Sequence, residues 1–363
     1  LNVSRSYLQS DSNVKKISSY ITRKVADRLS ELFAQHREEF QKKWDDLKIF
    51  IQYGIITDEK FAEKAADFVL LKNTEGKYFT LSEYAALVKE NQTDKNGNVI
   101  YLYTNDPVSQ NSFVGAARDK GYDVLVMDGQ LDTHFIGWFE NKNQGTRFVR
   151  VDADVVDKLI EKENNLKMAL SSAQQDLLRP VFEAQLPAED KIRYTVSFEP
   201  MAENQMPVMI TQNEFMRRMK DMAAMGGSGM QFYGQLPDNF NVVINGNHPL
   251  VAEILGEVEA SYGDKLKTTN KKLDAAIAEQ RSFEELVKDK KAEDFSQEEK
   301  DKQQEVDKKV EDLRRQRTER LTEIGRENKL VKQVVDLALL SNSMLKGENL
   351  TNFIRRSVEL IGK

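Results

Sequence analysis

The sequence contains no cysteine among its 363 residues, and only three histidines, at His36, His134 and His248. Disulfides, thiolate zinc sites and cysteine nucleophiles are therefore excluded, and a reducing compartment fits this composition. The histidines lie too far apart in the chain to predict a multi-histidine metal site, so surface or packing roles are expected instead. No apolar run approaches the roughly 20 residues that span a bilayer, and no signal-peptide pattern opens the sequence. We expect a soluble, cytoplasmic protein without a metal site.

The charge balance also argues against some partners. Although 31% of the residues are charged, 53 basic and 59 acidic residues leave a net charge of only -6. This balance predicts no overall attraction to nucleic acid. The glycine-rich run "GGSG" at residues 226–229 matches neither a phosphate-binding loop nor a nucleophile elbow. No complete active site is therefore expected within this chain.

The pattern of apolar residues predicts a multidomain fold that mixes α/β and α+β parts. Helical periodicity dominates the first 90 or so residues, and then "NVIYLY" and "YDVLVM" alternate with helical segments. Strands that alternate with helices predict a small, mainly parallel α/β unit. A polar helix from about residue 154 to 178 is expected to connect it to a second, α+β unit, with a boundary near residue 163.

Residues 264–323 form a distinct charged segment. More than half of them are charged, none is proline, and sparse apolar residues recur at helical spacings. Ser296 and Glu299 have the spacing of a helix capping box. This pattern predicts two helices folded into an antiparallel hairpin, with Gly325 ending the second one.

Methionine is concentrated in one place, since six of the eleven methionines fall between Met209 and Met230. Phe215, Met219 and Met222 share one face of a predicted helix. Two interpretations stay open: a buried helix, or a half-exposed apolar surface that adapts to many partners. We read the neighbouring charges, Arg217, Arg218, Lys220 and Asp221, as the solvent side of this helix, which favours a binding surface for unfolded chains.

The last two predicted helices carry more apolar surface than one neighbour can cover. We therefore expect self-association through a two-fold arrangement of these helices, with packing inside one subunit as the alternative. The residues expected at the dimer contact are Val334, Leu337, Leu340, Phe353, Ile354 and Leu360.

Several stretches, in this order, resemble the heat shock protein 90 chaperones, and specifically their bacterial group, HtpG. They are "LNVSRSYLQ", "TLSEYAALVKENQ" with "VIYLYT", "GYDVLVMDGQLD", "VVINGNHPLV" and "LTNFIRR". The resemblance covers nearly the whole chain apart from residues 264–323, which look like an insertion.

The resemblance implies a domain plan. Residues 1–162 would be the C-terminal portion of the middle domain, and 163–363 the C-terminal dimerization domain, with the helical hairpin inserted at about 264–323. The chain is then expected to be a fragment that lacks the N-terminal ATP-binding domain. In such a family Arg5 matches the arginine that reaches the γ-phosphate of ATP, with Gln9 and Asn2 in the same catalytic loop.

The resemblance also implies a function, that of an ATP-dependent chaperone of the stress response that holds clients as a dimeric clamp. ATP and magnesium would be cofactors of the full-length protein and would not be bound by this chain alone. Unfolded client proteins would contact Phe215, Met219 and Met222 on the C-terminal part, and Phe135 and Trp138 near His134 on the middle domain. A different class remains open, a non-enzymatic dimeric scaffold that uses the hairpin and the C-terminal helices to bind partners.

Overall fold

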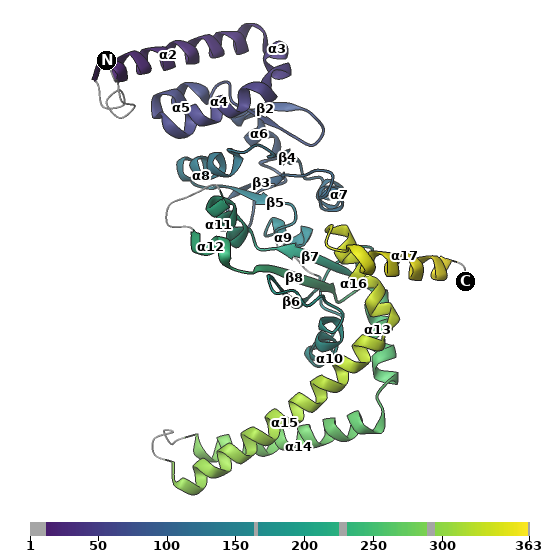
Figure 1. Ribbon diagram of the computed structural model, residues 1–363. Coiled ribbons are helices and arrows are strands. Elements are labelled where there is room, and N and C mark those ends of the chain that lie inside the picture. The colour runs from purple at the N-terminus through teal and green to yellow at the C-terminus, as the bar shows by residue number, and fades with distance from the viewer. Residues whose placement is uncertain (1–11, 163–165, 225–230, 289–294, 362–363) are drawn as a thin grey trace, which may run out of the picture. The chain divides into compact units, whose positions relative to one another are not determined.

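The computed structural model describes residues 12–162, 166–224, 231–288 and 295–361 (Figure 1). They form two compact units, Leu1–Asn164 with Thr211–Leu236, and Asn165–Ile210 with Pro237–Lys363. The second unit is not continuous over 163–363, however, because α11 (Glu214–Ala224) and α12 (Gln231–Gln235) belong to the first unit.

The first unit begins with helices, as the periodicity predicts. Side chains at the helix starts satisfy backbone N–H groups that would otherwise lack partners. Asp58 accepts a hydrogen bond from the backbone of Phe61 at 3.0 Å, and Thr80 with Glu83 forms a reciprocal capping box. The helices are α2 (Ser12–Gln35), α3 (Arg37–Lys42), α4 (Trp44–Thr57), α5 (Glu59–Ala65) and α6 (Leu81–Val88), and the antiparallel strands β1 (Leu70–Lys72) and β2 (Tyr78–Thr80) precede α6.

A three-stranded parallel sheet lies in this first unit, which confirms the predicted parallel α/β arrangement. Its central strand, β3 (Val99–Thr104), pairs with β4 (Val124–Val126) on one side and β5 (Thr146–Arg150) on the other. The crossover helices are α7 (Asn111–Asp119) and α8 (Asp132–Lys142). Aromatic rings fill the core beside the sheet: Tyr101 lies 4.9 Å from Tyr84 and 5.2 Å from Phe148, ring centre to ring centre and edge to face.

The predicted connecting helix over residues 154–178 is wrong. Among the described residues of this region, which leave out 163–165, the structure places the short α9 (Val156–Leu159) and the later α10 (Ser172–Glu183). A capping box formed by Ser171 and Gln174 begins α10 as a separate helix. The side chains of Leu178, Val181 and Phe182 are fully buried. An apolar face of this kind makes α10 part of a core instead of a polar connector.

The second unit contains a three-stranded sheet in the order β6 (Ile192–Glu199), β8 (Asp238–Asn245), β7 (Val208–Gln212), in which β6 and β8 run parallel. Helix α13 (Pro249–Ala260) follows β8. Pro249 occupies its first turn, where no backbone donor is needed, and His248 Nδ1 accepts a hydrogen bond from the backbone of Leu250 at 3.0 Å. Valine and isoleucine side chains of the sheet pack against α10 and α13 in one core.

The predicted charged hairpin is confirmed as two paired helices, α14 (Asp264–Val287) and α15 (Gln297–Glu327), which lie side by side (Figure 1). Ser296 and Glu299 form the expected capping box. Leu273, Ala276 and Val310 make a small core between the helices. The expected role of Gly325 is wrong, since α15 continues to Glu327 and Gly325 is buried inside the helix.

The chain closes with α16 (Lys329–Ser341) and α17 (Gly347–Ile361). Asn328 caps α16 through a hydrogen bond from the backbone of Val331 at 2.8 Å. Val331, Val335 and Ala338 are at most 1% exposed and belong to the same core as the sheet of the second unit. Among the described helices, none is long and apolar enough to cross a membrane.

Candidate functional site

Helix α11 is fixed to the first unit by charged side chains. The guanidinium of Arg217, which is 6% exposed, donates to the hydroxyl of Tyr103 on β3. The same group donates to Glu214 Oε1 at 2.8 Å and to Asp221 Oδ2 at 2.6 Å. A buried cation of this kind is tolerable because its two terminal nitrogens meet three acceptors. Arg217 therefore holds α11 against the parallel sheet.

A second arginine extends this anchor to α8. Arg218 donates to Glu140 Oε2 at 2.8 Å, to Glu214 Oε1 at 2.6 Å and to the carbonyl oxygen of Phe148 at 2.5 Å. Burial alone would raise the pKa of the Glu214 carboxyl, but the nearby charges of Arg217 and Arg218 hold this pKa below its usual value. Glu214 is consequently a carboxylate that pairs with both arginines, and the three residues hold one side of α11 against the first unit.

This anchor reverses one expectation from the sequence. We expected Arg217, Arg218 and Asp221 to mark the solvent side of α11, whereas Arg217 is buried and Arg218 is half-buried. Residues 214, 217, 218 and 221 share one helical face by their spacing of three and four. The charged face of α11 is thus its attached face.

The predicted apolar face of α11 lies to the side of this anchor. Phe215 is 60% exposed, while Met219 and Met222 are half-buried. Sequence reasoning missed Phe232 on α12, which is 67% exposed. Helix α12 packs on α11, so exposed aromatic rings occur on both of these short helices. The only signal for Phe232 in the sequence was its position just after the methionine cluster.

The two residues expected on the middle domain occupy different environments. Phe135 is 1% exposed and belongs to the aromatic core, so it offers no surface to a client, and the expectation for it does not fit its position. Trp138 is half-buried and stacks on Phe135 with ring centres 5.9 Å apart. Only Trp138 of this pair remains a candidate for client contact.

The residues expected at a dimer contact divide into two groups. Val334 and Phe353 are 4% and 9% exposed and belong to the core of the second unit, and Leu337 packs against that core, so these three are used within one subunit. Leu340 and Ile354, by contrast, are 36% and 53% exposed. Sequence reasoning missed Val358, one turn after Ile354 on α17 and 63% exposed, while the side chain of Leu360 lies outside the described part.

A buried carboxylate joins the two closing helices. Asp336 on α16 is fully buried and accepts from Lys332 at 2.7 Å and from Arg356 of α17. Gln333 also donates to the hydroxyl of Ser357 at 2.9 Å. These contacts fix the angle at which α17 leaves α16, and with it the position of Ile354.

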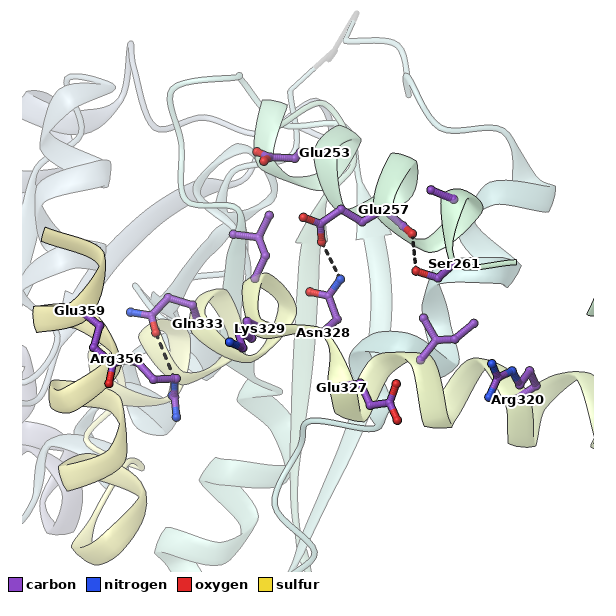
Figure 2. Close-up of a pocket in the computed structure, with 13 residues that line it drawn as sticks. Glu253, Glu257, Ser261, Arg320, Glu327, Asn328, Lys329, Gln333, Arg356 and Glu359 are labelled. Atoms are coloured by element: carbon purple, nitrogen blue, oxygen red, sulfur yellow. Dashed lines mark hydrogen bonds between the residues drawn. The ribbon is translucent and has the colours of Figure 1, made fainter. Parts of the chain in front are cut away.

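A cavity of about 760 Å³ lies beside the start of α16, and Figure 2 shows its polar lining. Asn328 donates to Glu257 Oε2 at 2.7 Å across it, and Arg356 donates to Gln333 Oε1 at 3.4 Å. Its charged lining residues are Glu253, Glu257, Glu327, Glu359, Arg320, Lys329 and Arg356. Because both signs of charge line it, this cavity does not select an anion or a cation.

The predicted catalytic residues Asn2, Arg5 and Gln9 lie outside the described residues. Within the residues that are described, no group of three or more histidine, aspartate or glutamate side chains is arranged to hold a metal ion. The site that the structure does define is the anchored helix α11 with its exposed apolar face.

Comparison with known proteins identifies the class. Residues 1–275 match the family model described as Hsp90 protein, and the chain belongs to the Hsp90 family. It is 48% identical over 361 residues to the chaperone protein HtpG of Bacteroides thetaiotaomicron, covering 99% of this chain and 53% of the relative. It is 45% identical to the HtpG of Porphyromonas gingivalis over the same length.

More distant relatives cover less of the chain. The HtpG of Bdellovibrio bacteriovorus is 26% identical over 264 residues, which is 70% of this chain and 40% of that protein. The chain spans about half the length of the Bacteroides and Porphyromonas relatives that it matches. These matches show that the chain is a member of the Hsp90 family.

Proposed function

We propose that this chain is the client-holding and dimerising part of an ATP-dependent chaperone, and that it binds unfolded or partly folded proteins on the apolar face of α11. The observation that supports this most strongly is the anchor of Arg217 and Arg218, which leaves Phe215 60% exposed on a fixed helix. Methionine side chains are flexible and polarizable, so Met219 and Met222 adapt to clients of differing shape. Trp138 and Phe232 are candidates to extend this face.

A triple substitution tests the client face. Replacing Phe215, Met219 and Met222 with serine should abolish most suppression of client aggregation while far-UV circular dichroism stays unchanged. The matched control replaces three apolar side chains of α4, Ile49, Phe50 and Tyr53, which are 42%, 74% and 63% exposed. Loss of suppression in the control alone, or unfolding of the α11 variant, would rule out this face.

We further propose a homodimer formed by α16 and α17, with Leu340, Ile354 and Val358 as the apolar contact. These side chains remain exposed after the core of the second unit is complete, and burying them offers about 25 cal/mol per Å². Removing α16 and α17 altogether would strip Val331 and Val335 from that core, so point substitutions are the sharper test.

Sedimentation distinguishes the candidate interfaces. Arginine in place of Leu340 and Ile354 should yield monomers. Replacing residues 274–312 with a short glycine-serine turn should leave the dimer intact, because Leu266, Leu321 and Ile324, which belong to the core of the second unit, are retained. The opposite result would move the interface to the hairpin.

The ATP-linked part of the function rests on the family resemblance. Arg5, with Gln9 and Asn2, is proposed to assist hydrolysis of ATP bound with magnesium by an N-terminal domain in the full-length protein, which would act in the cytoplasm. In that protein Arg5→Ala should slow hydrolysis by a factor on the order of 10³ while leaving nucleotide affinity nearly unchanged. An unaltered turnover rate would remove Arg5 from the site, and calorimetry should detect no binding of Mg-ATP to this chain alone.

The second candidate is a non-enzymatic dimeric scaffold, which the charged hairpin favours. A scaffold would not prevent client aggregation, and it would lose partner binding when residues 274–312 are removed. The aggregation assay therefore separates the two functions.

A further inference from the structure

The charged hairpin contains a groove between its two helices. The groove has a volume of about 380 Å³. Its floor is apolar, since Phe283, Val306 and Val310 point inward and are 7%, 3% and 2% exposed. The remaining lining residues are polar: Gln280, Glu284, Gln303, Asp307, Glu311 and Arg314. Because so little of this floor is exposed, a partner that enters the groove meets mainly its polar rim.

Three carboxylates and one cation form the charged rim. Asp307 accepts a hydrogen bond from Gln280 at 2.7 Å. Within the described residues, no ion pair involves Glu284 or Glu311, although adjacent charges on the same helices are paired, as Lys309 is with Glu279 at 2.9 Å. Two rim carboxylates are thus left to meet a cation from outside the hairpin.

The hairpin as a whole is electrically asymmetric. Residues 274–312, its outer part, carry fourteen aspartates and glutamates against eight lysines and arginines, a net charge of -6. Residues 264–273 and 313–327, its inner part, carry four acidic and nine basic residues, a net charge of +5. Such a field attracts a basic partner to the outer part and repels it from the inner part.

We propose that this groove binds a basic segment of a partner protein. A lysine or arginine side chain of that segment enters the groove above the buried floor, and its charged end meets Glu284 and Glu311. Arg314 closes the inner end of the groove and sets the direction of the segment by repelling further cations. This site is separate from the client face of α11 and does not depend on it.

Fluorescence anisotropy of a labelled peptide tests the proposal with the full chain at low ionic strength. The probe alternates lysine with alanine, so that it offers charge and aliphatic stems but little of the apolar surface of an unfolded client. A glutamate-alanine peptide of equal length is the negative control. Exposed charge pairs are worth little each, so Glu284→Gln with Glu311→Gln should weaken binding by roughly 3- to 10-fold.

Two further variants make the result specific. Arg314→Gln should tighten binding by about 2-fold, since it removes a like charge from the rim. Glu285→Gln with Glu305→Gln makes the same change in net charge on the same two helices, outside the groove, and should have a smaller effect. If circular dichroism shows that Glu284→Gln with Glu311→Gln disturbs the hairpin, the test rests on Arg314→Gln, which should bind the lysine-alanine peptide more tightly. The proposal would be overturned if both double substitutions weakened binding equally, or if Arg314→Gln bound the lysine-alanine peptide more weakly than the unsubstituted chain. Binding of the glutamate-alanine peptide would also overturn it.

Discussion

Gly325→Ala is expected to destabilise the second unit, although alanine favours helices. A methyl group at this position would lie 2.4 Å from the carbonyl oxygen of Val181 and 2.8 Å from its Cα, both backbone atoms of α10 that are unable to rotate away. Gln185 also donates to the carbonyl oxygen of Gly325 at 2.6 Å. The glycine therefore permits the close approach of α15 and α10.

The magnitude follows from three terms. Overpacking costs about 3 kcal/mol at the upper end of its range when backbone must shift. Alanine recovers about 1 kcal/mol of helix propensity, and weakening the Gln185 hydrogen bond costs about 0.5 kcal/mol. The net loss is about 2.5 kcal/mol, which lowers the melting temperature of a unit of this size by roughly 5–10 °C.

The assay is urea and thermal unfolding followed by far-UV circular dichroism, because both tryptophans, Trp44 and Trp138, belong to the first unit. The matched control is Gly256→Ala in α13, where a methyl group would meet nothing within 4 Å. It should stabilise by about 0.5–1 kcal/mol. If Gly325→Ala proves as stable as Gly256→Ala, the close packing of α15 on α10 is refuted.

Two further predictions concern charged pairs. Asp336→Asn should destabilise the junction of α16 and α17 by about 2 kcal/mol, because two charge-assisted hydrogen bonds to a fully buried carboxylate are weakened; urea unfolding measures this, and an unchanged midpoint would contradict it. Glu83 accepts two hydrogen bonds from Arg37, both at 2.6 Å, and this lowers the pKa of Glu83 from 4.5 to about 2. The resulting stabilisation of the folded state is present above pH 4.5 and is lost as the pH falls toward 2. Glu83→Gln, which can keep the capping box, should therefore make the free energy of unfolding depend less on pH in that window. A profile as steep as that of the unsubstituted protein would count against the pair.

Sequence patterns predicted the structure correctly where it depends on interactions between residues that are close in the chain. The hairpin helices and the Ser296 cap follow from spacing and capping chemistry within a few residues. Gly325 was read as a helix end because glycine often follows one, yet its reason for being glycine is a contact with Val181, which is distant in sequence. No local signal could reveal that contact.

The anchor of α11 shows a second limit. Charged side chains predict a solvent-facing side, because burial of an isolated charge is costly. Arg217 escapes that cost through Tyr103 and Glu214, and Tyr103 lies more than a hundred residues earlier in the chain. The same partners explain why Thr211–Leu236 joins the first unit, which the order of elements alone did not indicate.

The most direct test of the central claim uses the methionines as reporters. With ¹³C-labelled methionine methyl groups, addition of an unfolded client should shift or broaden the signals of Met219 and Met222. Met127 and Met201, which are 5% and 1% exposed, serve as internal controls and should stay unchanged. Client-induced changes at other positions with Met219 and Met222 unaffected would contradict client binding on α11.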